Sequence, residues 1–90
     1  MSGQTDLVYN RISVFRAEAA MSRRELAEKV GVNPQTIGFL ERGEYAPSVS
    51  LALQLARTFG VPVESLFSLQ PFPPLAQQLM SVSRIEGGNP

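Results

Sequence analysis

The sequence predicts an all-α domain of five helices followed by a short C-terminal helical extension. Helix start signals lie on both sides of Gly31, another precedes a long apolar segment at Ser48, and Gly43 and Gly60 are placed to end helices. The 90 residues, 43% of them hydrophobic, are enough for one small hydrophobic core. We divide the chain into a flexible leader, residues 1–8, a helical domain, residues 9–68, and an extension, residues 69–90, whose end we expect to be disordered.

The first two helices are predicted from their capping residues. Asn10 can cap a helix that runs to about Ala20, with Ile12 and Phe15 on its inner face. Ser22 and Glu25 form a capping box, in which the hydroxyl accepts from the Glu25 amide and the carboxylate accepts from the Ser22 amide. The second helix therefore starts at this box and ends at Gly31, and its buried stripe consists of Leu26, Ala27 and Val30.

The third helix starts at Asn33, which caps it, and has Pro34 in its first turn, where the missing amide hydrogen costs nothing. Ile37 and Leu40 anchor this helix in the core, and Gly43 stops it. With the second helix it makes a pair joined by one glycine turn, which is typical of a helix-turn-helix motif.

The segment from Val49 to Leu55 alternates apolar and polar residues, a pattern that also suits a strand. A helix is favoured because Ser48 is a good cap, the apolar character continues to Phe59, and Gly60 provides a stop. A short fifth helix is expected from Pro62 to Phe67. Prolines then interrupt the chain before a sixth helix, which the spacing of Leu75, Leu79 and Val82 indicates.

Composition excludes several classes of protein. The chain has no cysteine and no histidine, so it lacks disulfides, thiolate zinc sites and the commonest metal ligand and general base. No two ionisable residues form a plausible nucleophile and base. We therefore expect no enzyme activity, no metal and no cofactor. No segment approaches the roughly 20 apolar residues that span a bilayer, and the N-terminus lacks signal-peptide features, so a cytoplasmic protein without membrane contact is expected.

The helix-turn-helix pair predicts a surface for double-stranded DNA. In such a pair the second helix of the two lies in the major groove while the first braces it across the backbone. Its outward positions are Pro34, Gln35, Gly38 and Phe39, with Arg42 at the end. Gln35 is the most informative, because its amide can pair with the N7 and N6 edge of adenine. Since eight Lys and Arg balance eight Asp and Glu, the distribution of charge matters more than its sum.

From about residue 10 to residue 67 the chain resembles the Cro/C1-type helix-turn-helix family of phage and bacterial repressors, the XRE family. The matching segments begin with Ile12, Phe15 and Arg16 and include residues 22–27, 31–37, 40–43, 47–48, 55–56 and 59–61. The resemblance implies a five-helix, lambda-repressor-like DNA-binding domain that works as a dimer on a pseudo-palindromic operator.

Transferred to this sequence, the resemblance implies a role for each of ten residues. Base edges would be contacted by Pro34, Gln35, Gly38 and Phe39, and phosphates by Ser22, Arg23, Asn33 and Arg42. Arg16 and Glu41 would form a semi-buried structural ion pair between the first helix and the end of the third. Three residues depart from the usual pattern. Pro34 has no hydrogen-bonding side chain, Phe39 offers apolar contact alone, and Glu44 is acidic where lysine is common, so we expect modest operator affinity.

Surplus apolar residues suggest a homodimer. Val49, Ala52, Leu55, Ala56 and Phe59 suffice to cover one side of the core, which leaves other apolar side chains without a place. The predicted dimer interface consists of Leu51, Leu53, Leu69, Phe72, Leu75 and Leu79. In the alternative, the extension folds back on its own domain.

Two functions follow from these predictions. The first is a sequence-specific, homodimeric transcriptional regulator that represses by blocking access to a promoter. The second is an antitoxin-type or adaptor subunit whose main partner is another protein, bound through the C-terminal extension.

Overall fold

The computed structural model describes residues 7–44 and 46–73. Within these residues five helices and two short strands follow one another. Their bounds are β1 (Tyr9–Asn10), α1 (Ile12–Glu18), α2 (Arg23–Val30), α3 (Pro34–Glu41), α4 (Val49–Phe59), α5 (Val63–Leu66) and β2 (Phe67–Ser68). The predicted sixth helix, with Leu75, Leu79 and Val82, lies outside the described residues.

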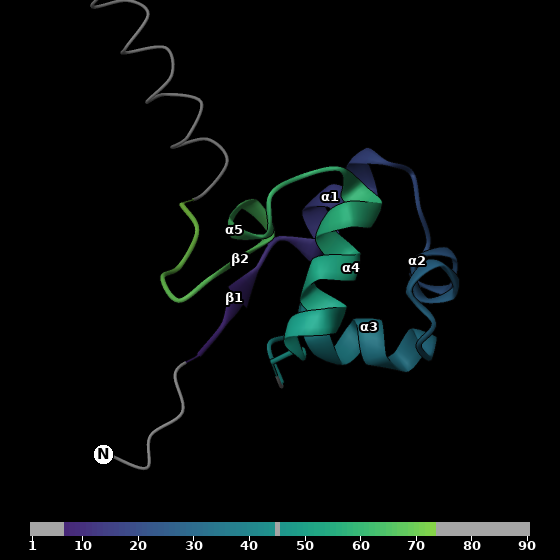
Figure 1. The fold of residues 1–90 in the computed structure, drawn as a ribbon, viewed down its shortest axis with the longest axis horizontal. Coiled ribbons are helices and arrows are strands. Elements are labelled where there is room, and N and C mark those ends of the chain that lie inside the picture. Colours follow the sequence, from purple (N-terminus) through teal and green to yellow (C-terminus); the bar gives the residue numbers. More distant parts are fainter. Residues whose placement is uncertain (1–6, 45, 74–90) are drawn as a thin grey trace, which may run out of the picture.

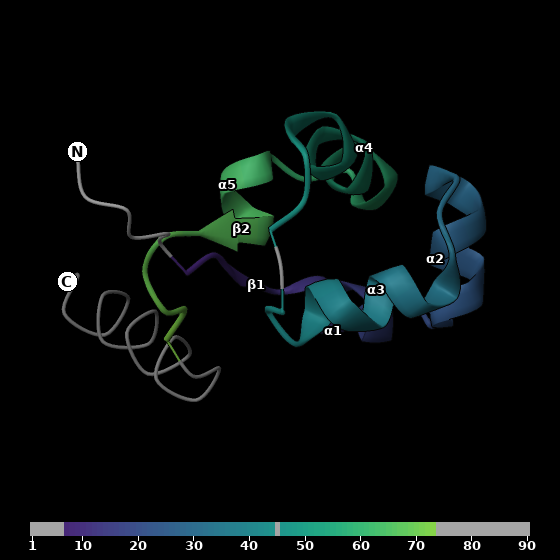
Figure 2. The ribbon, with the colours of Figure 1, turned by 90° about the horizontal axis from the view of Figure 1, so that it is seen from below.

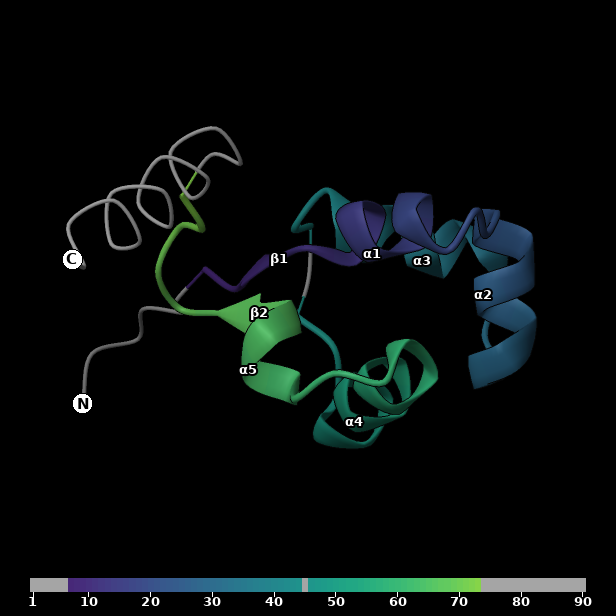
Figure 3. The same cartoon turned by 90° about the horizontal axis from the view of Figure 1, so that it is seen from above.

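The helices surround one core, with α2 at one end of the domain and the paired strands at the other (Figure 1). The two turned views place α4 on one side of the domain and α1 and α3 on the opposite side (Figures 2 and 3). All five helices contribute buried side chains to a single cluster. Its members are Ile12, Leu26, Ala27, Val30, Ile37, Leu40, Leu55, Ala56 and Leu66.

The predicted starts of α2, α3 and α4 are confirmed. Ser22, Asn33 and Ser48 are the N-caps, and each accepts a hydrogen bond from a backbone amide of its own helix. The helix ends at Gly31 and Gly60 are confirmed as well, since both glycines have a left-handed backbone with φ near 70°. The segment that alternates apolar and polar residues is therefore a helix, not a strand.

The first and fifth helices are shorter than expected, because Asn10 and Phe67 belong to an antiparallel ribbon and because α1 ends at Glu18, before Ala20 with its φ of 53°. Arg11, rather than the expected Asn10, is the N-cap of α1. Tyr9 pairs with Ser68 and Asn10 with Phe67, so Asn10 belongs to β1 and Phe67 to β2. Asn10 still serves the start of α1, since its Oδ1 accepts from the Ile12 amide at 3.0 Å. Its Nδ2 donates to the Leu40 carbonyl at 2.8 Å and so ties the ribbon to α3.

The inward face of α4 differs from the expected one at the start of the helix. Val49, expected in the core, is 76% exposed, whereas Leu51, expected to be surplus, packs against the core. The reason is rotational phase: Leu51, Leu55 and Phe59 share the inner side of α4, and Val49 shares its outer side with Leu53. None of the helices formed by the described residues is long and apolar enough to cross a membrane.

Candidate nucleic-acid interface

The outer side of α3, on the lower edge of the domain in Figure 1, carries an open hollow of about 420 Å³. Its lining combines all four residues expected at base edges with two of the four expected at phosphates: Arg23, Pro34, Gln35, Gly38, Phe39 and Arg42. Pro34 and Gln35 are exposed, and Phe39 is 39% exposed. Because Ile37 and Leu40 are fully buried on the other side, α3 is held in the core with this face outward.

The other two residues expected at phosphates, Ser22 and Asn33, are the exposed N-caps of α2 and α3. The Ser22 Oγ accepts from the Glu25 amide at 3.0 Å, and the Asn33 Oδ1 accepts from the Gln35 amide at 2.8 Å. These bonds use acceptor atoms of each side chain, so the hydroxyl hydrogen and the amide NH2 group retain donor capacity toward a phosphate oxygen.

A buried carboxylate connects α3 to the two preceding helices. Glu41, with a side chain only 5% exposed, accepts from the Arg16 Nε at 2.8 Å and from the Arg23 Nε at 2.9 Å. Arg16 also donates from Nη1 to the Met21 carbonyl at 3.1 Å. The pair expected between Arg16 and Glu41 is therefore part of a three-residue network that the sequence analysis missed at Arg23.

The network sets the ionisation of Glu41. Burial raises the pKa of this carboxyl, but hydrogen bonds from Arg16 and Arg23, together with their positive charges, outweigh burial and leave the pKa below its ordinary value. Glu41 is therefore a carboxylate at neutral pH, and it orients Arg23 at the edge of the hollow.

Arg42 folds back over the outer face of α3. Its Nε donates to the Glu44 Oε2 at 2.6 Å, and its guanidinium carbon lies 5.2 Å from the centre of the Phe39 ring. A Cβ placed on Gly38 would lie 3.2 Å from the Arg42 Nη1. Gly38 thus belongs to the face where it was expected but is buried, because the Arg42 guanidinium covers it.

The turn after α3 explains why Arg42 and Glu44 meet. Gly43 has a φ of 73°, and the Glu44 amide donates to the Phe39 carbonyl at 3.0 Å, as in a Schellman turn. This turn reverses the chain and places Glu44 beside the last turn of α3. In the sequence, the only signal for the ion pair between Arg42 and Glu44 was that these residues flank a glycine.

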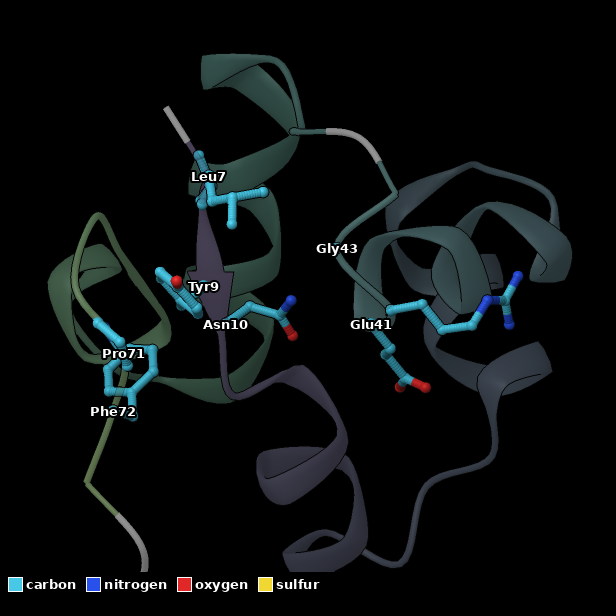
Figure 4. Close-up of a pocket in the computed structure, with 9 residues that line it drawn as sticks. Leu7, Tyr9, Asn10, Glu41, Gly43, Pro71 and Phe72 are labelled. Carbon is cyan, nitrogen blue, oxygen red and sulfur yellow. The ribbon is translucent and has the colours of Figure 1, made fainter. Parts of the chain in front are cut away.

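A second open hollow, of about 350 Å³, lies between the ribbon and the end of α3. Figure 4 shows Leu7, Tyr9, Pro71 and Phe72 on its ribbon side and Gly43 on the opposite side, with Asn10 between them. The Asn10 side chain is already engaged by Leu40 and Ile12. The Asn10 side chain is therefore a structural cross-link in the lining of this hollow, which adjoins the hollow on α3 and shares Arg42 with it.

The residues predicted for a dimer interface differ in how far they are exposed to solvent. Leu53 and Leu69 are 53% and 59% exposed, whereas Leu51 packs on the core. Phe72 is half-buried, and the Arg11 guanidinium carbon lies 4.2 Å from the centre of its ring. Leu75 and Leu79 lie outside the described residues, as does most of the extension on which a protein partner was predicted to bind.

An exposed helix, anchored by its rear face and joined to a bracing helix by one glycine turn, defines a helix-turn-helix DNA-binding domain. The helix-turn-helix family model matches residues 12–66 of this chain. An uncharacterized HTH-type transcriptional regulator of Archaeoglobus fulgidus is 53% identical over 57 residues, which cover 63% of this chain and 81% of the relative. The uncharacterized HTH-type transcriptional regulator YgzD of Bacillus subtilis is 38% identical over 61 residues, 68% of this chain and 92% of YgzD.

Solved structures agree with this assignment. A candidate DNA-binding protein from Bacteroides fragilis is 30% identical, with a TM-score of 0.62, and the match covers 68% of this chain and 98% of that protein. The hypothetical transcription factor NHTF from Neisseria, 23% identical with a TM-score of 0.59 over 78% of this chain and 75% of its own, has the same fold. The chain belongs to the Cro/C1-type helix-turn-helix family of DNA-binding transcription regulators.

Proposed function

We propose that this protein is a transcriptional repressor that binds a pseudo-palindromic operator as a homodimer, with the outer face of α3 in the major groove. The observation that carries the proposal is the hollow on α3, where Pro34, Gln35 and Phe39 lie beside Arg23 and Arg42. A dimer bound across a promoter represses by blocking access to it.

Within this proposal, side chains of α3 contact the DNA bases, and residues at the starts of α2 and α3 contact the DNA backbone. Gln35, exposed in the first turn of α3, pairs with adenine through its amide. Pro34 and Phe39 make apolar contacts, for example with a thymine methyl group, and Gly38, covered by the Arg42 guanidinium, contributes no side chain of its own. Arg23, Ser22 and Asn33 contact phosphates and set the position of α3.

The dimer places two copies of α3 on successive half-sites, about one helical turn apart. Its support is the exposed apolar strip of α4, in which Val49 and Leu53 are one helical turn apart and 76% and 53% exposed. Leu69, also exposed, adds apolar area beyond the ribbon. Exposed apolar residues grouped on one helix face are typical of a protein–protein interface.

Selection of bound fragments from a random pool of duplexes tests the function. The proposal predicts an enriched inverted repeat with half-sites about one helical turn apart. Selection of an asymmetric motif would contradict the dimer on a symmetric operator, and no retention of any duplex at low ionic strength would overturn the function itself.

Two variants test the assigned roles on the selected duplex. Gln35→Ala is expected to relax preference at one base pair, at a cost of about 1 to 3 kcal/mol on the preferred sequence. Arg23→Ala is expected to weaken binding to all sequences alike and to lower the salt slope by about one unit. Equal losses on all duplexes for both variants would contradict the assignment of Gln35 to a base.

A further inference from the structure

The Arg42 side chain occupies the space that a side chain at position 38 would take. A Cβ on Gly38 would lie 3.2 Å from the Arg42 Nη1, and 3.9 Å from both Cζ and Nη2. The guanidinium is therefore above the middle of the outer face of α3, a full turn back from its own Cα. Gly38 makes this placement possible because it has no side chain of its own.

Two contacts hold the guanidinium in this orientation, one with the Glu44 carboxylate and one with the Phe39 ring. The Schellman turn at Gly43 fixes Glu44 beside α3, and the Glu44 carboxylate accepts from the Arg42 Nε at 2.6 Å. Phe39 lies under the same guanidinium, with 5.2 Å between the Cζ and the ring centre. Because the ion pair with Glu44 uses Nε, the Nη1 and Nη2 groups of Arg42 retain donors for a ligand.

This arrangement suits a base better than a phosphate. Glu44 brings a negative charge within hydrogen-bond distance of Arg42, so a phosphate that approached Arg42 would also meet the Glu44 carboxylate. The major-groove edge of guanine instead presents two neutral acceptors, O6 and N7, at the spacing of a planar guanidinium fork.

We propose that Arg42, held by Glu44 over Gly38, is a specificity-determining residue that reads a guanine in the operator. This inference rests on the proposed DNA-binding function and replaces the phosphate contact that the family resemblance implied for Arg42. Glu44 is its positioning residue. The Arg42 guanidinium thus takes the place on the outer face of α3 that a side chain at position 38 would have.

The test uses the full chain and the duplex that it selects from a random pool, with each base pair of one half-site exchanged in turn. Affinities are measured by fluorescence anisotropy at several salt concentrations. Arg42→Lys is the decisive variant, because it keeps the positive charge and removes the planar fork. Arg24→Lys is the matched control, because Arg24 is exposed on α2 and does not line the hollow on α3. Circular dichroism and thermal unfolding verify that each variant is folded.

The proposal predicts that Arg42→Lys loses about tenfold in affinity for the selected duplex and no longer discriminates at one G·C pair, while Arg24→Lys keeps the full preference. Glu44→Gln is expected to weaken preference at the same pair with Arg42 still present. The proposal is overturned if Arg42→Lys keeps the wild-type preference at every pair, or if Arg42→Ala weakens all duplexes alike and lowers the salt slope by about one unit. In both cases a selected inverted repeat would leave the proposed function standing, whereas failure of the wild type to select any duplex would remove both.

Discussion

Glu41 joins three helices through one carboxylate, because it accepts from Arg16 in α1 and from Arg23 at the start of α2 while belonging to the last turn of α3. Its side chain is 5% exposed and that of Arg16 is 21% exposed. Removing one partner from such a pair leaves a charge with little solvation. The network therefore stabilises the position of α3 rather than contacting DNA bases.

Arg16→Ala is expected to lower the free energy of unfolding by about 2 kcal/mol, since hydrogen bonds to a buried carboxylate are lost. Preference among DNA sequences should stay as in the wild type, because Arg16 is not part of the hollow on α3. Urea unfolding measures the first effect and competition between selected duplexes measures the second. A variant of normal stability with altered preference would contradict the structural role.

The lowered pKa of Glu41 makes stability depend on pH in a known direction. A group whose pKa is lower in the folded chain contributes stability above its unfolded pKa, near the ordinary value of 4.5, and that contribution is lost as pH falls through the folded pKa. Urea unfolding below pH 4.5 should therefore show a steeper loss of stability for the wild type than for Glu41→Gln. Glu25, whose pKa is lowered by hydrogen bonds from the Ser22 backbone and hydroxyl, contributes to the remaining acid dependence. Identical pH profiles for the two proteins would contradict the assignment.

The helices α2, α3 and α4 each begin after a residue whose side chain accepts a hydrogen bond from a backbone amide of that helix. For α4 this residue is Ser48, whose Oγ accepts from the Leu51 amide at 3.1 Å. Such caps define where a helix starts and so fix which side chains of α4 reach the core.

Ser48→Ala is expected to cost about 1 kcal/mol of unfolding free energy, because the first turn of α4 loses its cap. Ser50→Ala is the matched control: Ser50 is an exposed serine two residues later in the same helix, where alanine is well tolerated. The control should change stability by no more than about 0.5 kcal/mol. Thermal unfolding measures the stability of both variants. Equal losses of stability for the two would argue against a capping role for Ser48.

The helices could be predicted from the sequence because their signals are local: a capping residue, a run of apolar positions and a glycine. The ribbon could not, since β1 and β2 are two residues each and pair across nearly the whole domain. The prediction of the inner face of α4 was wrong at Val49 and Leu51. Apolar residues surround the start of this helix, so packing against the rest of the domain decides which of them face the core. Likewise, the sequence placed Gln35 and Phe39 on the outer face, but only the turn at Gly43 places Arg42 over Gly38.

For the whole molecule, the balanced charge gives no general attraction to DNA, so binding depends on the few groups on one face. A dimer doubles these contacts, and the second half-site binds at a high effective concentration. The modest basic character of the outer face of α3 thus makes dimerisation central to the proposed function.

Leu53→Glu is expected to convert a dimer at micromolar concentration into a monomer and to weaken binding to the inverted repeat, because a charge would be buried in the interface. Val14→Glu is the matched control, since Val14 is 49% exposed on α1 rather than on α4. Light scattering across a dilution series gives the mass of each protein. A wild-type chain that is already monomeric at micromolar concentration would contradict the dimer.

An amide NMR titration of the full chain with its selected duplex tests whether the outer face of α3 enters a DNA groove while α2 braces it. We expect the largest chemical-shift changes to fall between Asn33 and Arg42 and at the start of α2, with little change in α5. Changes confined to α5 and the ribbon, with α3 unaffected, would contradict it.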